Sequence, residues 1–334
     1  MAAEKVLQID VLTGVFKLLS DETRLRILSL LREGELAVGE LQKVLGLGQS
    51  TLSTQLGLLK EQELVASRKE GQKVFYRIPG RGDDGREDPR LAILASALES
   101  TGAAKWHARD MRNLRKVLEE RSEKTREFFN SMAVQNLPSP GQTWKALCNG
   151  LIRLIRGQRI VDLGCGNGRL SILLARAGNH VTGVDSSEEQ IRLAREKAAE
   201  SGAPADPSSP ARTSQVTPGV EFLRAPMEAT GLPAGGHDIV IFSQSLHHAA
   251  KPREAVAESY RLLAKGGRIL ILDLLAHGEE WMRSRFGDFW LGFSQADLEG
   301  WLKEAGFREV HVEITGASKD YPDIEGLLVQ AEKP

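Results

Sequence analysis

Several features are scarce or absent in this 334-residue sequence, and each absence narrows the class of protein. The two cysteines, Cys148 and Cys165, lie apart without metal-ligand spacing, which fits a reducing, cytoplasmic compartment. No run of about 20 apolar residues exists, so we expect no membrane span and no membrane partner. The opening stretch MAAEKVLQID lacks a long apolar core, so we expect no signal peptide.

An excess of charge is also lacking, since the formal net charge is −1. Residues 1–80 hold 11 Lys and Arg against 10 Asp and Glu, so any DNA binding must rest on local groups. The length allows about two domains of roughly 150 residues each. Two segments have the composition of connectors: 79–89, PGRGDDGREDP, and 202–219, whose Pro, Ser and Ala content predicts a mobile loop inside a domain.

The first 80 residues predict short helices followed by a hairpin. Ser20 and Asp21 can cap a helix over 22–32, and a helix over 38–45 is followed by the glycine turn GLGQS. A further helix over 49–62 precedes alternating strands at 64–67 and 73–78 around EGQK. Two short helices joined by a glycine turn, with a hairpin behind them, favour a winged helix-turn-helix over 8–80.

Polar side chains cover the outer face of the helix over 49–62 and the hairpin behind it. Gln can pair with adenine, Ser and Thr can reach base edges or phosphates, and a basic hairpin suits phosphate contact. An ordinary solvated helix face would have the same composition, so the residues alone leave both interpretations open. The DNA-binding candidates are Gln49, Ser50, Thr51, Ser53, Thr54, Gln55, Arg68, Lys69 and Lys73.

The stretch from about Val11 to Ile78 resembles the ArsR/SmtB family of winged-helix repressors. The segments that carry the resemblance are SDETRLRIL, GQSTLSTQL and RKEGQKVFYR. The resemblance implies a homodimer that binds an inverted-repeat operator in double-stranded DNA and leaves it when an effector binds. Many members sense metals through a Cys-x-Cys pair, but Ala37 and Gly39 occupy those places, and His107 is the lone histidine in the dimer-helix region. We therefore predict no metal site.

A long helical region is predicted over 91–132, between the two domains. Leu91, Leu94, Ala95 and Leu98 form one apolar stripe. Leu114, Val117 and Leu118 form another. These stripes fit either a linker that packs on its own domain or a dimer seam, and the sequence does not decide between them.

From residue 158 the pattern alternates short apolar strands with helices, which predicts a parallel, doubly wound sheet over 133–334. The stretch VDLGCGNGRL places glycines 164, 166 and 168 between a strand and a helix, where the backbone can approach a ligand and the helix N-terminus can bind an anion. Asp185 ends the next strand, HVTGVD, where an acid can accept both hydroxyls of a ribose.

Residues from about Phe128 to Gly316 resemble class I S-adenosylmethionine-dependent methyltransferases. DLGCGNG, GVD, DIVIFSQSLHH and RLLAKGGRILILD occur in the family's order. The resemblance implies that S-adenosylmethionine or S-adenosylhomocysteine binds here. One departure is RAPMEA, where Pro226 and Met227 replace the usual adenine-binding acid. The implied ligand contacts are Asp162, Gly164, Cys165, Gly166, Gly168, Asp185, Ser186, Met227 and Ser243.

The sequence leaves catalysis open. His247, His248 and His277 are weak candidate bases, because ordinary packing and hydrogen bonding more often account for such histidines. The aromatic segment from His277 to Phe293 can cap a substrate pocket or shield the ligand. No Asn-Pro-Pro-Tyr stretch is present, which argues against methylation of amino groups on bases.

The predicted architecture is an α+β winged helix-turn-helix followed by an α/β doubly wound, Rossmann-like methyltransferase domain. This layout resembles ArsR-type regulators fused to methyltransferase-like domains, a group proposed to sense S-adenosylhomocysteine. Two functions therefore remain. One is an ArsR-type DNA-binding transcriptional repressor whose methyltransferase-fold domain binds S-adenosylmethionine or S-adenosylhomocysteine as effector. The other is an active methyltransferase of a small-molecule acceptor with a fused regulatory domain.

Overall fold

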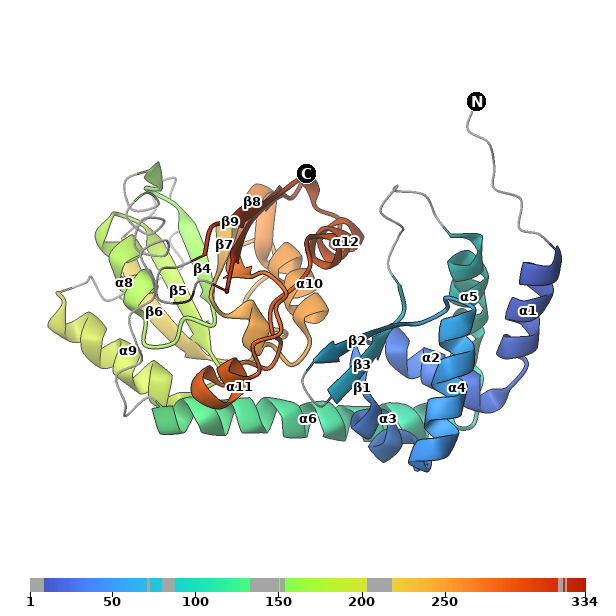
Figure 1. Ribbon diagram of the computed structural model, residues 1–334. Helices are drawn as coiled ribbons and strands as arrows, with labels where there is room; N and C mark the ends of the chain where they lie inside the picture. Colours follow the sequence, from blue (N-terminus) through green and yellow to red (C-terminus); the bar gives the residue numbers. More distant parts are fainter. Residues whose placement is uncertain are drawn as a thin grey trace. The chain divides into compact units, whose positions relative to one another are not determined.

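The computed structural model describes residues 9–70, 73–79, 88–132, 150, 154–202, 218–317, 321 and 323–334. The chain divides into two compact units, Met1–Arg121 and Ser122–Pro334, and each is described by itself (Figure 1). Most of the predicted connectors 79–89 and 202–219 lies outside the described residues. The tip of the hairpin and Cys148 also lie outside them.

The first unit contains the predicted winged helix-turn-helix. Its elements are α1 (Ile9–Leu19), α2 (Glu22–Arg32), β1 (Leu36–Ala37), α3 (Val38–Leu45), α4 (Gln49–Glu61), β2 (Ala66–Glu70), β3 (Lys73–Arg77), α5 (Pro89–Glu99), the 3₁₀ helix η1 (Ser100–Ala103) and α6 (His107–Met132), which continues into the second unit. The strands form an antiparallel sheet in the order β1-β3-β2.

Local signals in the sequence set the boundaries of these helices. The Asp21 side chain accepts a hydrogen bond from the backbone N–H of Arg24, so Asp21 caps α2 as predicted. Gly46 has a φ of 69° and ends α3, which opens the turn before α4. Leu52, Leu56 and Leu59 are fully buried, so α4 packs one apolar face inward and presents the other to solvent.

The predicted helical region 91–132 consists of α5, the 3₁₀ helix η1 and α6. The Thr101 hydroxyl donates to the carbonyl of Leu98, and Gly102 follows, which together favour a tight 3₁₀ turn over a continuing α-helix. Leu94, Leu98 and Leu114 are buried in the core of the first unit. The leucines and Val117 of both apolar stripes therefore pack on their own domain, whereas Ala95 is exposed.

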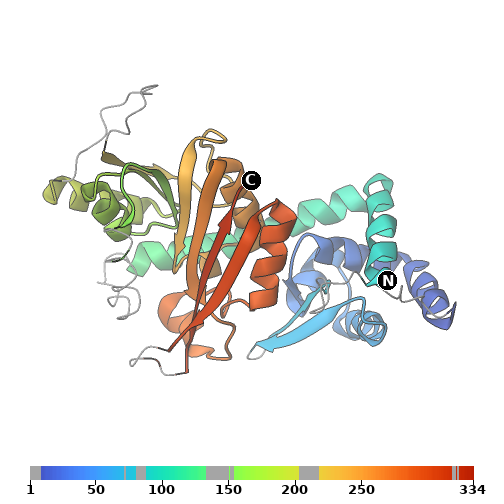
Figure 2. The ribbon, with the colours of Figure 1, turned by 90° about the horizontal axis from the view of Figure 1, so that it is seen from above.

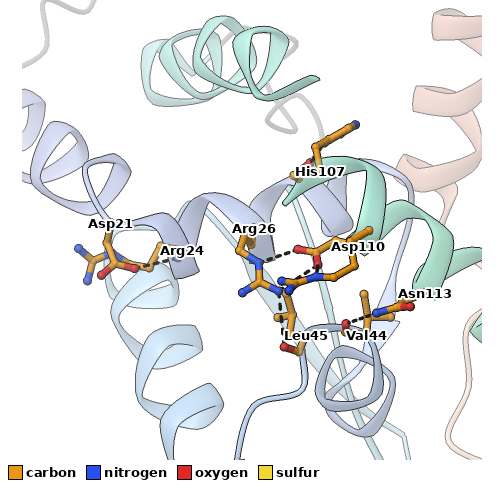
Figure 3. Close-up of polar contacts among 10 residues, drawn as sticks. Asp21, Arg24, Arg26, Val44, Leu45, His107, Asp110 and Asn113 are labelled. Atoms are coloured by element: carbon orange, nitrogen blue, oxygen red, sulfur yellow. Dashed lines mark hydrogen bonds and ion pairs between the residues drawn. The ribbon is translucent and has the colours of Figure 1, made fainter. Parts of the chain in front are cut away.

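Ion pairs attach α6 to the helices of the first unit. The Arg26 guanidinium on α2 donates to both carboxylate oxygens of Asp110, at 2.6 and 2.9 Å, and Asn113 donates to the carbonyl of Val44 (Figure 3). Arg121 donates to Glu40 on α3 at 2.7 Å. The carboxylate of Asp110 is fully buried, so this attachment is internal to the unit.

The second unit is built on one seven-stranded sheet. Its elements after α6 are β4 (Arg159–Leu163), α8 (Arg169–Arg176), β5 (His180–Asp185), α9 (Glu188–Glu200), β6 (Gly219–Arg224), β7 (His237–Ser243), the 3₁₀ helix η2 (Leu246–His248), α10 (Pro252–Leu262), β8 (Leu263–Leu274), α11 (Trp281–Phe286), α12 (Gln295–Ala305), β9 (Arg308–Thr315) and β10 (Gly326–Glu332).

The strand order is β6-β5-β4-β7-β8-β10-β9, and β10 runs antiparallel to both neighbours (Figure 2). The order reverses between β4 and β7, which is the switch point where doubly wound folds bind ligands. Helices α8 and α9 pack near β5 and β6, whereas α10 and α12 pack together along β7, β8 and β9. The predicted doubly wound sheet is confirmed. None of the described helices is long and apolar enough to cross a membrane.

Candidate functional site

Helix α4 presents the predicted DNA-binding side chains at its surface. The exposed ones are Gln49, Ser50, Thr51, Ser53 and Thr54. Gln55 is half-buried, and its side-chain oxygen accepts a weak hydrogen bond from Arg24 at 3.4 Å. The N-terminal half of α4 therefore carries an exposed polar face, whereas Gln55 belongs partly to the packing of its own unit.

The basic residues predicted on the wing, which is formed by β2 and β3, differ in their contacts and exposure. Arg68 donates two hydrogen bonds to Glu35, at 2.8 and 2.9 Å, and its guanidinium lies 5.0 Å from the ring centre of Phe75. Lys69 and Lys73 are exposed near the tip of the hairpin. Arg68 therefore holds the wing in place, and the two lysines are the groups that can reach a phosphate.

The glycine turn after β4 depends on the absence of side chains. Gly164, Gly166 and Gly168 have φ values of 75°, 51° and 73°, in the left-handed region that favours glycine. A Cβ at Gly164 would lie 2.4 Å from Cβ of Ser245, and a Cβ at Gly168 would lie 2.6 Å from the ring of Phe222. The turn is therefore packed closely against neighbouring segments and opens directly into α8.

Asp185 lies at the end of β5, beside this turn. Its carboxylate accepts hydrogen bonds from the backbone N–H of Gly166 at 2.9 Å and of Ser187 at 2.8 Å. Burial raises the pKa of Asp185, although hydrogen bonds from Ser187, Gly166 and Ser186 oppose that rise. The sequence-predicted acid thus holds the turn and the backbone of the following residues together.

Asp162 and Cys165 differ in burial, since Asp162 lies in the core and Cys165 is half-buried. Asp162 is almost fully buried and accepts a hydrogen bond from the Ser171 hydroxyl at 2.6 Å. Burial raises the pKa of Asp162 to about 6, with the Ser171 hydrogen bond opposing the rise. Burial also raises the pKa of the Cys165 thiol, which therefore stays protonated and is a poor nucleophile.

Two further segments approach the glycine turn. The methyl carbon of Met227, after β6, lies 3.2 Å from the Cβ position of Gly164. Ser243 ends β7, Gln244 has a positive φ of 56°, and the Ser245 hydroxyl donates to the carbonyl of Leu163 at 2.6 Å. The structure thus brings the predicted Met227 and the β7 terminus to the same edge of the sheet as the glycine turn.

Gln190, on α9, is a polar residue of this region that sequence reasoning missed. Its side chain is buried, and its Oε1 atom makes no hydrogen bond to any described residue. The same atom lies 3.9 Å from the Cβ position of Gly166. A buried acceptor without a donor, facing a glycine turn, fits a ligand that supplies the donor.

The three candidate histidines do not share one environment. His247 Nδ1 lies 2.7 Å from Asp273, and its Nε2 lies 3.6 Å from Asp288. Burial alone would lower the pKa of His247, but the two carboxylates outweigh it and raise the pKa to about 10. Burial, followed by the charge of His247, lowers the pKa of His248 to about 3. Burial also lowers the pKa of His277.

Asp273 and Asp288 are also absent from the sequence-based candidates. Asp273 is the penultimate residue of β8, and Asp288 follows the short helix α11. The two carboxylates flank His247 from positions 26 and 41 residues further along the chain. No local spacing in the sequence indicates this arrangement, because only the sheet order places these segments together.

Comparison with known families agrees with this geometry. Residues 21–67 match the family model described as bacterial regulatory protein, arsR family. Residues 161–271 match the model described as methyltransferase domain. The chain joins an arsR-family regulatory region to a methyltransferase domain. The arsR-family region spans α2 to β2, and the methyltransferase domain contains the glycine turn, Asp185 and both histidines of η2.

Curated relatives resemble the part of the chain that contains the methyltransferase domain. Ubiquinone biosynthesis O-methyltransferase from Cronobacter sakazakii is 28% identical over 200 residues, covering 53% of the chain and 76% of that protein. The enzyme of that name from Erwinia tasmaniensis is 29% identical over 178 residues, covering 49% of the chain and 65% of that protein.

A solved structure shares the fold of the second unit. It is a chain of the complex between the Haloferax volcanii Trm112 methyltransferase activator and a methyltransferase, with 18% identity and a TM-score of 0.50. The match covers 63% of the chain and 97% of the solved one.

Proposed function

We propose that this chain is an ArsR-type DNA-binding regulator whose methyltransferase domain binds S-adenosylmethionine or S-adenosylhomocysteine as an effector. The observation that carries the proposal is a contrast inside the second unit. The glycine turn and Asp185 form a closely packed ligand-binding edge, whereas the histidines beside it are poorly suited to proton transfer.

The ligand site fits an S-adenosyl compound in three respects. The backbone at Gly164–Gly168 is accessible to the amino-acid end of the ligand because no Cβ intervenes. The Asp185 carboxylate is positioned for ribose hydroxyls. The unsatisfied Oε1 of Gln190 supplies a further acceptor for a ligand donor. Asp162 would contribute through Ser171 and α8, and Met227 would cover the adenine.

Catalysis is the less supported function because a general base works best with a pKa near the operating pH. His247 faces carboxylates from both of its nitrogens, and the pKa of His248 is far below neutrality. The segment after α11 also lies over this edge of the sheet. Trp290 donates hydrogen bonds from its backbone to the carbonyl of His247 and from its indole to the carbonyl of Ala249. The backbone N–H of Phe293 donates to the carbonyl of Leu274.

That segment is the feature that separates the two functions. Trp290, Leu291 and Phe293 are each at most 5% exposed, so they are packed as core rather than lining an open substrate pocket. A sensor needs the effector enclosed in this way, whereas a methyltransferase also needs room for an acceptor next to the methyl group.

DNA binding is assigned to the exposed face of α4 and to Lys69 and Lys73 on the wing. We assign the homodimer to α1, where Ile9 and Phe16 are 79% and 55% exposed, a degree of exposure that a second copy would reduce. A two-fold dimer would place two α4 helices over the halves of an inverted repeat.

Helix α6 supplies a physical connection between effector and DNA. In the first unit Arg121 pairs with Glu40 on α3, the helix that precedes α4. In the second unit the Phe128 ring packs on Gly287, where an added Cβ would lie 2.3 Å from it, next to Asp288. Both contacts are made by one continuous helix. An effector shifts the DNA equilibrium only if it binds the DNA-competent and DNA-free states with different affinity.

The test is fluorescence anisotropy of the purified protein on labelled DNA from upstream of its own gene. S-adenosylhomocysteine and S-adenosylmethionine are titrated separately. We expect one of them, at micromolar concentration, to weaken DNA binding at least about 10-fold, which corresponds to about 1.4 kcal/mol of coupling. DNA binding that neither compound changes would contradict the effector role.

A second function, methylation of a small molecule, is favoured by one observation: the curated relatives of the second unit are named O-methyltransferases. Purified protein incubated with methyl-labelled S-adenosylmethionine and phenolic acceptors tests it. Transfer of label to an acceptor would support this function, and label that stays in the cofactor would favour the sensor.

A further inference from the structure

A group of buried polar side chains lies beside the ligand edge, between η2, β8 and the segment after α11. Its centre is His247, with Asp273 on one side and Asp288 on the other. The side chains of these three residues are 5%, 0% and 1% exposed. His248 adjoins His247, with 4.0 Å between the ring centres.

The carboxylate of Asp288 is the unusual member of this group. Among the residues that the structure describes, none donates a hydrogen bond to either of its oxygens. A buried carboxylate without hydrogen bonds carries a large desolvation cost, so it requires a cation close by. The Nε2 atom of His277 is also buried and makes no hydrogen bond to a described residue.

The distance between His247 and Asp288 does not fit a simple hydrogen bond. The Nε2–Oδ1 separation is 3.6 Å, whereas N–H···O hydrogen bonds have separations of about 2.7–3.2 Å. Two ligands of one tetrahedral ion, each about 2.0–2.2 Å from the metal, lie about 3.3–3.6 Å apart. The observed separation is compatible with two ligands that share one ion.

The positions of the neighbouring groups complete a ligand set. His247, His248 and Asp288 each offer one ligand atom, and these atoms all lie within 4.8 Å of one another. Asp273 holds Nδ1 of His247 at 2.7 Å, which leaves Nε2 directed at Asp288. A carboxylate on the outer nitrogen of a histidine is the usual support of a metal-bound imidazole.

We propose that His247, His248 and Asp288 bind a divalent transition-metal ion, with Asp273 as the positioning residue of His247. Two imidazoles and one carboxylate suit Zn²⁺ and leave a fourth position for water. The site differs from the ArsR-type metal sites whose absence the sequence predicts, because its ligands lie in the second unit. It requires no effector or DNA, so it stands apart from the proposed function.

The alternative occupant of this position is a proton on His247, which would make an imidazolium between two carboxylates. That arrangement needs no His248 and binds no metal. The two possibilities therefore differ in zinc stoichiometry and in the effect of changing His248.

The first experiment uses the full-length protein, stripped with a chelator and dialysed into chelator-free buffer. ZnCl₂ is titrated by isothermal calorimetry in the absence of DNA and of S-adenosyl compounds. We expect one equivalent to bind to the wild type, and Asp288→Asn and His248→Gln each to abolish that binding. The matched control is His311→Gln, an exposed histidine on β9, which retains it. A wild type that binds no Zn²⁺, or an Asp288→Asn variant that binds as tightly as wild type, would overturn the proposal.

A second measurement needs no variant and so remains informative if a variant does not fold. Co²⁺ added to the stripped wild-type protein should give the strong visible absorption of a four-coordinate site, and one equivalent of Zn²⁺ should remove it. A spectrum as weak as that of Co²⁺ in water would exclude the site.

Discussion

Gly164 and Ser245 approach each other so closely that a Cβ on the glycine would lie 2.4 Å from Cβ of the serine. This approach joins the turn after β4 to the end of β7, on the two sides of the switch point of the sheet. The Ser245 hydroxyl strengthens the contact by donating to the carbonyl of Leu163. The ligand-binding edge is therefore one packed structure rather than two independent loops.

Gly164→Ala should abolish binding of S-adenosylhomocysteine, because the added methyl group must displace Ser245 and the backbone strain at φ 75° adds about 1–2 kcal/mol. Gly166→Ala is the matched control. It has a φ of 51° but meets only Gln190 at 3.9 Å, so it should retain the fold and lose affinity less. Calorimetric titration measures both. Equal affinities of the two variants would contradict the packing argument.

Asp185→Asn should weaken S-adenosylhomocysteine binding about 10–100-fold while DNA binding is unchanged. The amide retains the size of the carboxylate but loses the charge-assisted hydrogen bonds, each of which contributes about 1.5–3 kcal/mol. Calorimetry measures the ligand, and anisotropy measures the DNA. Loss of both activities would show that Asp185 acts through folding rather than through ligand contact.

In the wing, Lys69→Ala or Lys73→Ala should weaken DNA binding on all sequences and reduce the slope of log K against log salt by about 1. Arg68→Ala should act differently, because Arg68 pairs with Glu35 and stacks on Phe75. We expect it to lower the stability of the first unit and to leave the salt slope nearly unchanged. Anisotropy at several salt concentrations distinguishes the two kinds of variant. A slope that is reduced by Arg68→Ala and not by either lysine variant would assign the phosphate contact to Arg68 instead.

Asp110→Leu alone should lower the free energy of unfolding by about 3–5 kcal/mol, because it leaves the buried Arg26 guanidinium without its carboxylate. Arg26→Met should cost less, because Asp110 retains the exposed Arg109 at 3.3 Å. The double variant should lie much closer to wild type. The exposed pair Lys43 and Glu120 is the control, and its loss should cost under about 1 kcal/mol. Urea denaturation followed by fluorescence tests this prediction, which fails if the two single effects simply add.

Asp162 predicts a pH dependence of stability. Its pKa is about 6 in the folded chain against an ordinary 3.8, so the folded state retains a proton that the unfolded state releases. Its contribution is therefore greatest below pH 3.8 and falls as pH rises through 6, by up to about 3 kcal/mol.

Asp162→Asn removes this titration while retaining an acceptor for Ser171. The stability of the variant relative to wild type should therefore increase between pH 4.5 and pH 7.5. Denaturation curves of both proteins at the two pH values provide the measurement, and a difference independent of pH would refute the assignment.

The amino-acid sequence by itself determined the order and type of most elements, although it did not indicate α1 or β1. Asp21 caps α2, Gly46 ends α3, and the glycines after β4 open α8, because each of these effects acts within a few residues of the chain. The winged helix, the doubly wound sheet and the placement of Asp185 at a strand end followed from such local patterns.

Only the tertiary structure decided which side chains face one another. It showed Arg68 held by Glu35, and His247 held between Asp273 and Asp288. It also showed that the apolar stripe with Leu94 packs in its own unit. The residues in each of these ion pairs lie between 26 and 41 positions apart in the chain, and the order of strands and the packing of helices bring them together. Periodicity in a sequence carries no information about such partners.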